Sequence, residues 1–261
     1  MTGTVRTLVE RRELLYLLVW RELIVKYKQS VMGLLWAILM PALIVTAGIV
    51  VKFAFATVAG QPLNATDIAN VAVKAVPWAF FVSSIRFATN SLVANRELVT
   101  KVYLPREIFP VASVFSQFVD FGIAAVVLTA VLAVARVGVS LQLAWVPLLV
   151  GLLLAHCIAF AILLSAASLF FRDVKYIVEA VITFAIFFTP VFYDIAIFGR
   201  WANILMLNPI APILEGLSAV VVYHRAPPLG WVAYSTGALV VVWLLSNGFF
   251  RKMEPYFAES I

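Results

Sequence analysis

Apolar runs long enough to cross a lipid bilayer fill most of this sequence. A helix that crosses the hydrocarbon core needs about 20 mainly apolar residues, because each residue adds only about 1.5 Å of length. Hydrophobic residues make up 64% of the 261 residues and charged residues only 12%, whereas a soluble domain carries about 25% charged residues. We therefore expect an all-α integral membrane protein with six transmembrane helices: Met32–Phe55, Val71–Phe87, Val111–Ala135, Leu143–Phe170, Ile177–Tyr193 and Trp231–Phe250.

The second expected span is the weakest, because Lys74 and Arg86 interrupt it. A charge at membrane depth costs at least about 2.5 kcal/mol unless its side chain reaches the head groups or faces water. A charged loop begins only a few residues after Arg86. We interpret Arg86 as reaching toward the head groups of the cytoplasmic leaflet, and a position beside a water-filled path is the alternative.

Most of the 19 Lys and Arg residues flank the expected spans on one side of the membrane. Cations accumulate on the cytoplasmic side of membrane proteins, so we expect both termini to lie in the cytoplasm. The formal net charge of +6 would suggest a nucleic-acid partner in a soluble chain. Here the membrane topology accounts for the cations, and we expect no nucleic-acid partner.

Two segments outside the spans have compositions of their own. Residues 1–30 mix cations with leucines at helical spacing and precede the six-span domain, residues 31–261. They predict an amphipathic helix in the cytoplasmic interface, and a basic flank that only sets orientation is the alternative. Residues 194–230 are broken by prolines, and Ile210–Val222 has about half the length of a crossing. A re-entrant hairpin buried against protein is the favoured interpretation, with a seventh crossing as the alternative.

The segment 95–110 is the longest charged stretch between two strongly apolar runs. It carries both cations and carboxylates and is closed by Pro105 and Pro110. We expect a short rigid helix in this loop through which a separate soluble motor acts on the membrane domain. Arg172 and Asp173 follow the fourth span and form either a second, smaller contact or a simple turn between helices.

The motifs of several catalytic chemistries are missing. No glycine precedes Lys-Ser or Lys-Thr at the spacing of a phosphate-binding loop, and no His-Glu-x-x-His zinc motif occurs. We therefore expect no catalytic residue, metal site or cofactor on this chain, and we interpret its two histidines as structural. Asp120 and Glu179 are the best residues for a proton relay, although pairing with a neighbouring helix is the commoner fate of such carboxylates.

Aromatic residues gather in two of the expected spans. Phenylalanine in a span usually faces lipid or packs against a neighbour, and Trp and Tyr usually mark the interface. Sugars also stack their apolar faces on aromatic rings, so these residues are alternatively a sliding surface for a glycan. The residues concerned are Trp78, Phe80, Phe81, Phe184, Phe188, Phe192 and Tyr193.

The order of several motifs resembles one family, the transmembrane (permease) subunits of ATP-binding-cassette exporters of polysaccharides. That family exports O-antigen, teichoic acid, capsule and related cell-envelope glycans from bacteria. The resemblance covers nearly the whole chain. It rests on Trp20-Arg21-Glu22-Leu23, Lys26-Tyr27-Lys28-Gln29-Ser30, Lys101-Val102-Tyr103-Leu104-Pro105-Arg106-Glu107, Phe171-Arg172-Asp173-Val174, Thr189-Pro190-Val191-Phe192-Tyr193 and Leu207-Asn208-Pro209.

The resemblance implies a function and a set of partners. The chain would be a non-enzymatic permease in a bacterial cytoplasmic membrane that moves a lipid-linked polysaccharide, as a homodimer with two nucleotide-binding ATPase subunits. ATP and Mg²⁺ would bind to those subunits. The residues coupled to the ATPase would be Arg96, Glu97, Lys101, Tyr103, Arg106, Glu107, Arg172 and Asp173. The helix at the entrance would present Trp20, Arg21, Lys26, Tyr27 and Lys28.

Three other functions remain open at this stage. An exporter of the same architecture for a small amphiphile or drug would have the same spans and loop. A membrane-embedded enzyme acting on lipid-linked sugars would need clustered carboxylates or a metal site, and the sequence patterns indicate neither. A proton-driven carrier would depend on Asp120.

Overall fold

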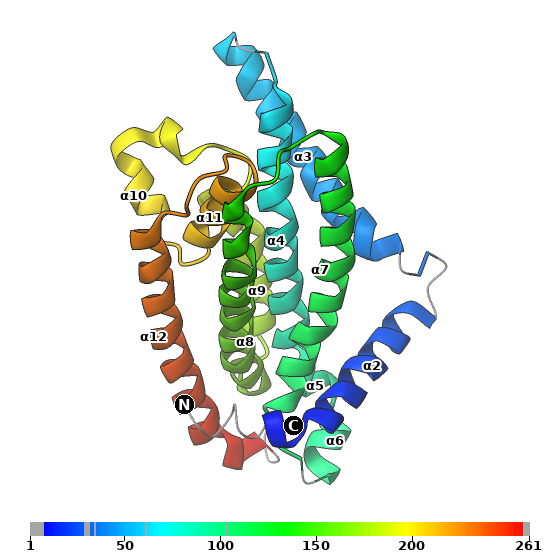
Figure 1. The fold of residues 1–261 in the computed structure, drawn as a ribbon. Coiled ribbons are helices and arrows are strands. Elements are labelled where there is room, and N and C mark those ends of the chain that lie inside the picture. The colour runs from blue at the N-terminus through cyan, green and yellow to red at the C-terminus, as the bar shows by residue number, and fades with distance from the viewer. Residues whose placement is uncertain (1–7, 29–31, 34, 61, 103, 258–261) are drawn as a thin grey trace.

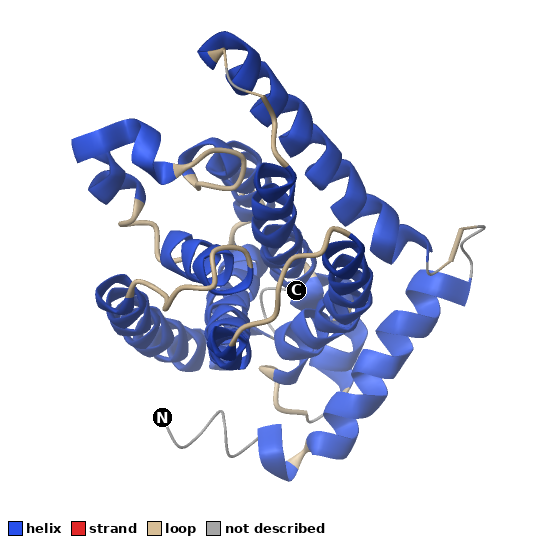
Figure 2. Cartoon of the chain, turned by 45° about the horizontal axis from the view of Figure 1, so that its top comes forward, coloured by secondary structure: helices blue, strands red, loops and turns tan. Residues whose placement is uncertain are grey.

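The protein is described by a computed structural model that covers residues 8–28, 32–33, 35–60, 62–102 and 104–257. This part of the chain consists of helices and loops, as Figure 2 shows. The α-helices are α2 (Arg12–Lys28), α3 (Leu35–Ala59), α4 (Ala65–Thr89), α5 (Ser91–Ala94), α6 (Arg96–Lys101), α7 (Ile108–Val134), α8 (Val146–Phe170), α9 (Val174–Phe188), α10 (Ala202–Leu205), α11 (Ala211–Val221) and α12 (Leu229–Met253). Short 3₁₀ helices are η1 (Leu141–Trp145), η2 (Ile195–Trp201) and η3 (Glu254–Tyr256).

Five helices of the described residues have the length and apolarity to cross a membrane: α3, α4, α7, α8 with η1, and α12 with η3. The expectation of an all-helical, multi-pass membrane protein is therefore confirmed. The fifth predicted span is shorter than expected, because α9 has 15 residues and ends at Phe188 rather than at Tyr193. The next residue, Thr189, is extended because it precedes Pro190, whose ring disfavours helical geometry in the residue before it.

The helix α4 occupies the centre of the bundle (Figure 1). It packs against α3, α7, α8, α9 and α11, and 72% of its most apolar stretch is buried. The span that was weakest in the sequence is thus the best-covered helix. Its two cations are paired: the Lys74 ammonium lies 2.6 Å from Glu215 of α11, and Nε of Arg86 lies 2.7 Å from Glu179 of α9.

The helix α3 lies at the edge of the bundle, where it packs mainly on α4 and α7. Its approach to its neighbours requires Gly48. A Cβ atom at that position would lie 2.6 Å from side-chain carbons of both Val71 and Phe192, which is inside van der Waals contact. Most other side chains of α3 are exposed in the single chain.

The bundle has two ends of different character, and we name them by their short helices. At the α6 end, α2 lies obliquely against α7, and α12 ends at this same end of the bundle (Figure 1). A cluster of buried apolar side chains holds these elements together, and it includes Leu18, Val99, Phe109, Phe250 and Phe257. At the α11 end, the proline-rich segment folds back over the bundle as η2, α10 and α11 (Figure 1).

A polar network fastens the α11 end. Lys52 of α3 lies 2.6 Å from Asp194 and 3.3 Å from Asp67. Asn70 of α4 donates to Asp194 and to the Tyr223 hydroxyl. Burial alone would raise the pKa of Asp194, but the hydrogen bond and charge of Lys52 hold that pKa below its usual value.

The buried pair Lys74–Glu215 yields a stability prediction. Only 1% of the Lys74 side chain is exposed, so Lys74→Met leaves a largely covered carboxylate without its cation. We expect a loss of about 3–5 kcal/mol, seen as a lower midpoint of thermal unfolding in detergent micelles.

Two further variants sharpen this test. The double variant Lys74→Met/Glu215→Gln recovers most of the loss, because it removes both charges. Lys101→Met, at an exposed position of α6, leaves the midpoint unchanged. A Lys74→Met protein as stable as the wild type would contradict the prediction.

Candidate functional site

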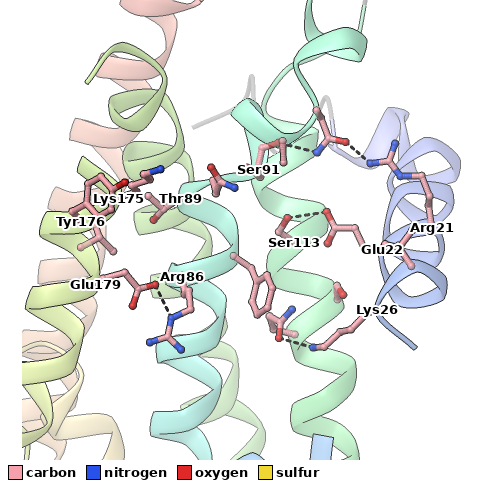
Figure 3. Close-up of a pocket in the computed structure, with 18 residues that line it drawn as sticks. Arg21, Glu22, Lys26, Arg86, Thr89, Ser91, Ser113, Lys175, Tyr176 and Glu179 are labelled. Carbon is pink, nitrogen blue, oxygen red and sulfur yellow. Dashed lines mark hydrogen bonds and ion pairs between the residues drawn. The ribbon is translucent and has the colours of Figure 1, made fainter. Parts of the chain in front are cut away.

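A pocket of about 680 Å³ opens at the α6 end of the bundle, between α2, α4, α5, α7 and α9 (Figure 3). We call it the charged pocket. Its cations are Arg21, Lys26, Arg86 and Lys175, and its carboxylates are Glu22 and Glu179. The cations come from three different helices, so the tertiary fold, not the local sequence, brings them together.

The wall formed by α2 is fixed to α7 through polar contacts. Ser113 donates to Glu22 over 2.8 Å, and Lys26 donates to Gln117 over 3.1 Å and also to Asp120. These three α7 positions lie near one face, because their spacing of three to four residues follows the helical repeat. Glu22 and Lys26 of α2 therefore face α7.

Apolar and charged residues share the outward side of α2. Leu17 and Trp20 are exposed by 60% and 53%, and Arg12, Arg21 and Lys28 are exposed as well. Exposed apolar side chains with cations beside them are typical of a helix in the lipid interface. This face agrees with the interfacial position expected from the sequence, which stays a prediction.

The predicted entrance residues are thus divided between two places. Arg21 and Lys26 line the charged pocket, and Tyr27 donates to Asp120 beneath it. Trp20 and Lys28 are exposed. The two candidates for a proton relay are both paired. Asp120 accepts hydrogen bonds from Lys26 and Tyr27, and Glu179 accepts one from Arg86.

The opposite wall of the pocket comes from α4 and α9. Arg86 donates through Nε to Glu179, and both side chains are nearly half exposed. Lys175 lies over the ring of Tyr176, 4.7 Å from its centre. Arg86 thus lines an open pocket, which favours the water-facing alternative for this cation.

A second, smaller pocket adjoins the charged pocket. It has a volume of about 320 Å³ and lies between α3, α4 and α7, and we call it the apolar pocket. Trp36, Met40 and Ile44 of α3 line one side. Lys26, Arg86, Phe87 and Gln117 line both pockets, so these residues form the boundary between a polar and an apolar space.

The residues predicted to couple to an ATPase differ in exposure. Arg96, Glu97, Lys101, Arg172 and Asp173 are exposed, and Glu97 and Lys101 form an ion pair of 3.7 Å along α6. Arg106 instead donates to the backbone carbonyl of Glu254 and lies over the ring of Phe257. Glu107 is only 8% exposed, and Tyr103 lies outside the described residues. The five exposed residues are those that a partner subunit can contact in this conformation.

The predicted aromatic surface also separates into two groups. Trp78 and Phe80 are buried in the main core, where Trp78 stacks on Phe81 and Phe80 packs on Phe118 and Phe121. Phe192 packs over Gly48, and Tyr193 packs on Phe198. On α9, Phe184 and Phe188 are exposed by 62% and 67%.

Sequence reasoning did not include several residues of the charged pocket. Glu22, Ser113, Gln117 and Lys175 line it, and none of them was in a predicted site. The contacts of α2 with α7 join residues about 90 positions apart. The sequence contained one indication of this contact surface: polar residues of α7 recur at a spacing of three to four, at Ser113, Gln117 and Asp120.

Long apolar helices around a charged pocket define a multi-pass membrane protein. The sequence pattern of the ABC-2 type transporter family matches residues 13–222, and the chain therefore belongs to that family. It is 31% identical, over all of both chains, to the O-antigen export system permease protein RfbA of Myxococcus xanthus. Two RfbA proteins of Klebsiella pneumoniae are 27% identical over 95% of each chain. These relatives confirm the resemblance to polysaccharide-exporting permeases.

The partly buried carboxyl of Glu22 yields a prediction about pH. Burial raises the pKa of Glu22, and the Ser113 hydrogen bond and the charges of Arg21 and Lys26 oppose that rise only in part. Below its ordinary pKa the group is protonated in both the folded and unfolded states. As the pH rises through the higher folded-state pKa, the folded protein must bury a charge, so stability is lost.

Glu22→Gln keeps an acceptor for Ser113 and removes that charge. We expect the thermal midpoint of the variant, relative to wild type, to rise as the pH increases from 4 to 8. The matched variant Glu97→Gln, on exposed α6, shows no such trend. A constant difference between Glu22→Gln and wild type over that range would contradict the assignment.

Proposed function

We propose that the chain is the permease subunit of an ATP-driven exporter that moves a lipid-linked polysaccharide across the bacterial cytoplasmic membrane. The observation that carries this proposal is the similarity to O-antigen export permeases over the full length of both chains. The charged pocket beside an apolar one supports it, because a lipid-linked glycan has a charged linkage and an apolar anchor. No observation favours export of a small amphiphile or drug.

The energy for export would come from a separate nucleotide-binding subunit that carries ATP and Mg²⁺. The sequence contains no phosphate-binding loop of its own. The short helix α6 supports this arrangement, since its charged residues are exposed while Val99 anchors it in the apolar cluster at that end. A helix that is anchored on one face and charged on the other is suited to transmit force to the bundle.

The proposed topology has six crossings, with α9 as the fifth. Both termini and α6 would then lie in the cytoplasm, in agreement with the distribution of cations. The segment 194–230, which contains η2, α10 and α11, would form the outer re-entrant region. Within it, α11 is buried against the bundle, as a re-entrant segment requires, whereas most residues of η2 and α10 are exposed.

We further propose that two copies of the chain associate through a surface that includes α9. One side of α9 carries the exposed residues Ile177, Val181, Phe184 and Phe188. Their spacing of three to four residues places them on a single face. The other side, with Val178 and Ile182, is buried against Ile85. In a symmetric dimer the same surface is used by both subunits, and the exposed phenylalanines of α9 would then border the glycan path.

The substrate is tested by depleting the protein in its native host. We expect a lipid-linked glycan to accumulate on the cytoplasmic side, as seen by lipid extraction and by protection from an externally added glycosidase. Re-expression of the wild type clears it. An unchanged glycolipid pool would exclude the proposed substrate class.

The role of α6 is tested by exchanging its charges. The double variant Glu97→Lys/Lys101→Glu keeps the net charge and an ion pair within the helix. It reverses the charge at each of the two positions, so a group of the ATPase subunit that was attracted to that position is now repelled. Like-charge contacts at an interface cost several kcal/mol, so binding to the ATPase subunit should weaken by at least about tenfold, measured by co-purification and by ATPase stimulation.

Arg225→Glu is the matched control, because Arg225 is exposed at the α11 end. It should leave both measurements unchanged. Normal stimulation by the α6 double variant would show that this helix is not the lever.

A further inference from the structure

The charged pocket and the apolar pocket together form one amphipathic site. They share Lys26, Arg86, Phe87 and Gln117. On one side of this boundary lie the remaining cations, Arg21 and Lys175. On the other side lie side chains of spans, which include Met40 and Ile44 and, next to the boundary, the carboxylate of Asp120. A site of this kind fits the charged head and the proximal tail of an anionic lipid.

The cations of this site are not equally available. Arg86 uses its Nε for Glu179, and no described residue hydrogen-bonds to its other two nitrogens. Lys175 rests on an aromatic ring, and no carboxylate of a described residue pairs with it. These two side chains present free donors to the pocket.

Lys26 is held differently from Arg86 and Lys175. Its ammonium donates to Asp120 and Gln117, and it lies 5.3 Å from the centre of the Phe87 ring. Asp120 also accepts from the hydroxyl of Tyr27. Asp120 thus occupies Lys26, one of the two cations at the boundary between the pockets.

We propose that the phosphate end of a single-chain lipid binds by displacing Asp120 from Lys26. This inference rests on the proposed function, because it names the lipid-linked end of the exported substrate as the ligand. A diphosphate carries more charge and more acceptor oxygens than one carboxylate and can engage Lys26 and Arg86 together. Asp120 keeps the Tyr27 hydrogen bond after the exchange, so it is not left without a donor.

The apolar pocket is small, with a volume of about 320 Å³, and we infer that it takes up the proximal part of one hydrocarbon chain. A lipid with two chains would have to place its second chain outside this pocket.

The exchange also has a mechanical result. Lys26–Asp120 is one of the contacts that fix α2 to α7, together with Glu22–Ser113. Loss of this contact on binding loosens the end of α2 next to the first span. Entry of the lipid head would therefore be coupled to a movement of α2.

The test is a titration of farnesyl diphosphate into the full-length protein in detergent micelles, followed by calorimetry. Asp120→Asn removes the internal competitor and should tighten binding by about five- to tenfold, whereas Lys26→Gln should weaken it by about tenfold. Tyr27→Phe deprives Asp120 of its second donor, so Asp120 holds Lys26 more firmly and binding should also weaken.

The opposite signs for Asp120→Asn and Tyr27→Phe distinguish exchange from a structural role, because a loss of structure weakens binding in both. Tyr27 lines neither pocket, so its effect must pass through Asp120. Asp67→Asn is the matched control, since Asp67 is an ion-paired carboxylate at the other end of the molecule. Unchanged or weaker binding by an Asp120→Asn protein with a normal thermal midpoint would overturn the proposal.

Three comparison ligands identify which part of the lipid is bound. Inorganic diphosphate and farnesol should each bind at least about tenfold more weakly than farnesyl diphosphate, and so should a two-chain phosphatidic acid. Equal binding of inorganic diphosphate would overturn the role of the apolar pocket. These titrations need neither ATP nor glycan. Failed export with intact binding therefore refutes the proposed function alone, and failed binding with intact export refutes the exchange alone.

Discussion

Charge pairing on α4 is the interaction on which the rest of the bundle depends. A buried cation in a membrane helix is stable only with a partner that compensates its loss of water. The buried Lys74 finds that partner on α11, and the half-exposed Arg86 pairs with Glu179 of α9. The two pairs therefore link two further segments to the central helix. They connect α4 to α11 at one end and to the charged pocket at the other.

The two ends of the molecule use their charges differently. At the α11 end, Lys52, Asp67 and Asp194 form contacts that join three segments of the chain. At the α6 end, the charges border an open pocket and an exposed helix. The first arrangement ties segments of the fold together, whereas the second leaves donors and acceptors that can change partners.

Much of the fold could be predicted from the sequence, because apolar length is a local property. The spans around α3, α7, α8 and α12 were found for that reason. The second span looked weak because one-dimensional reasoning counts Lys74 and Arg86 as penalties, while their partners lie far along the chain. The end of α9 was misplaced because the sequence remained apolar past Thr189-Pro190, although the backbone did not remain helical.

The site was less accessible to such reasoning than the fold. Basic residues of α2 were recognised, since a cation-rich helix has a local pattern. Glu22, Ser113 and Gln117 were not, because their role depends on α2 lying against α7. Aromatic residues show the same limit: Trp78 and Phe184 are alike in sequence, yet one is in the core and the other on the surface.

The short length of α9 bears on the proposed glycan path. Its 15 residues span about 22 Å at 1.5 Å per residue, less than the roughly 30 Å of an average hydrocarbon core. At the proposed interface between two copies, the apolar wall beside α9 would therefore be lower than beside the longer helices. A polar sugar chain that passed along α9 would have a shorter apolar distance to cross.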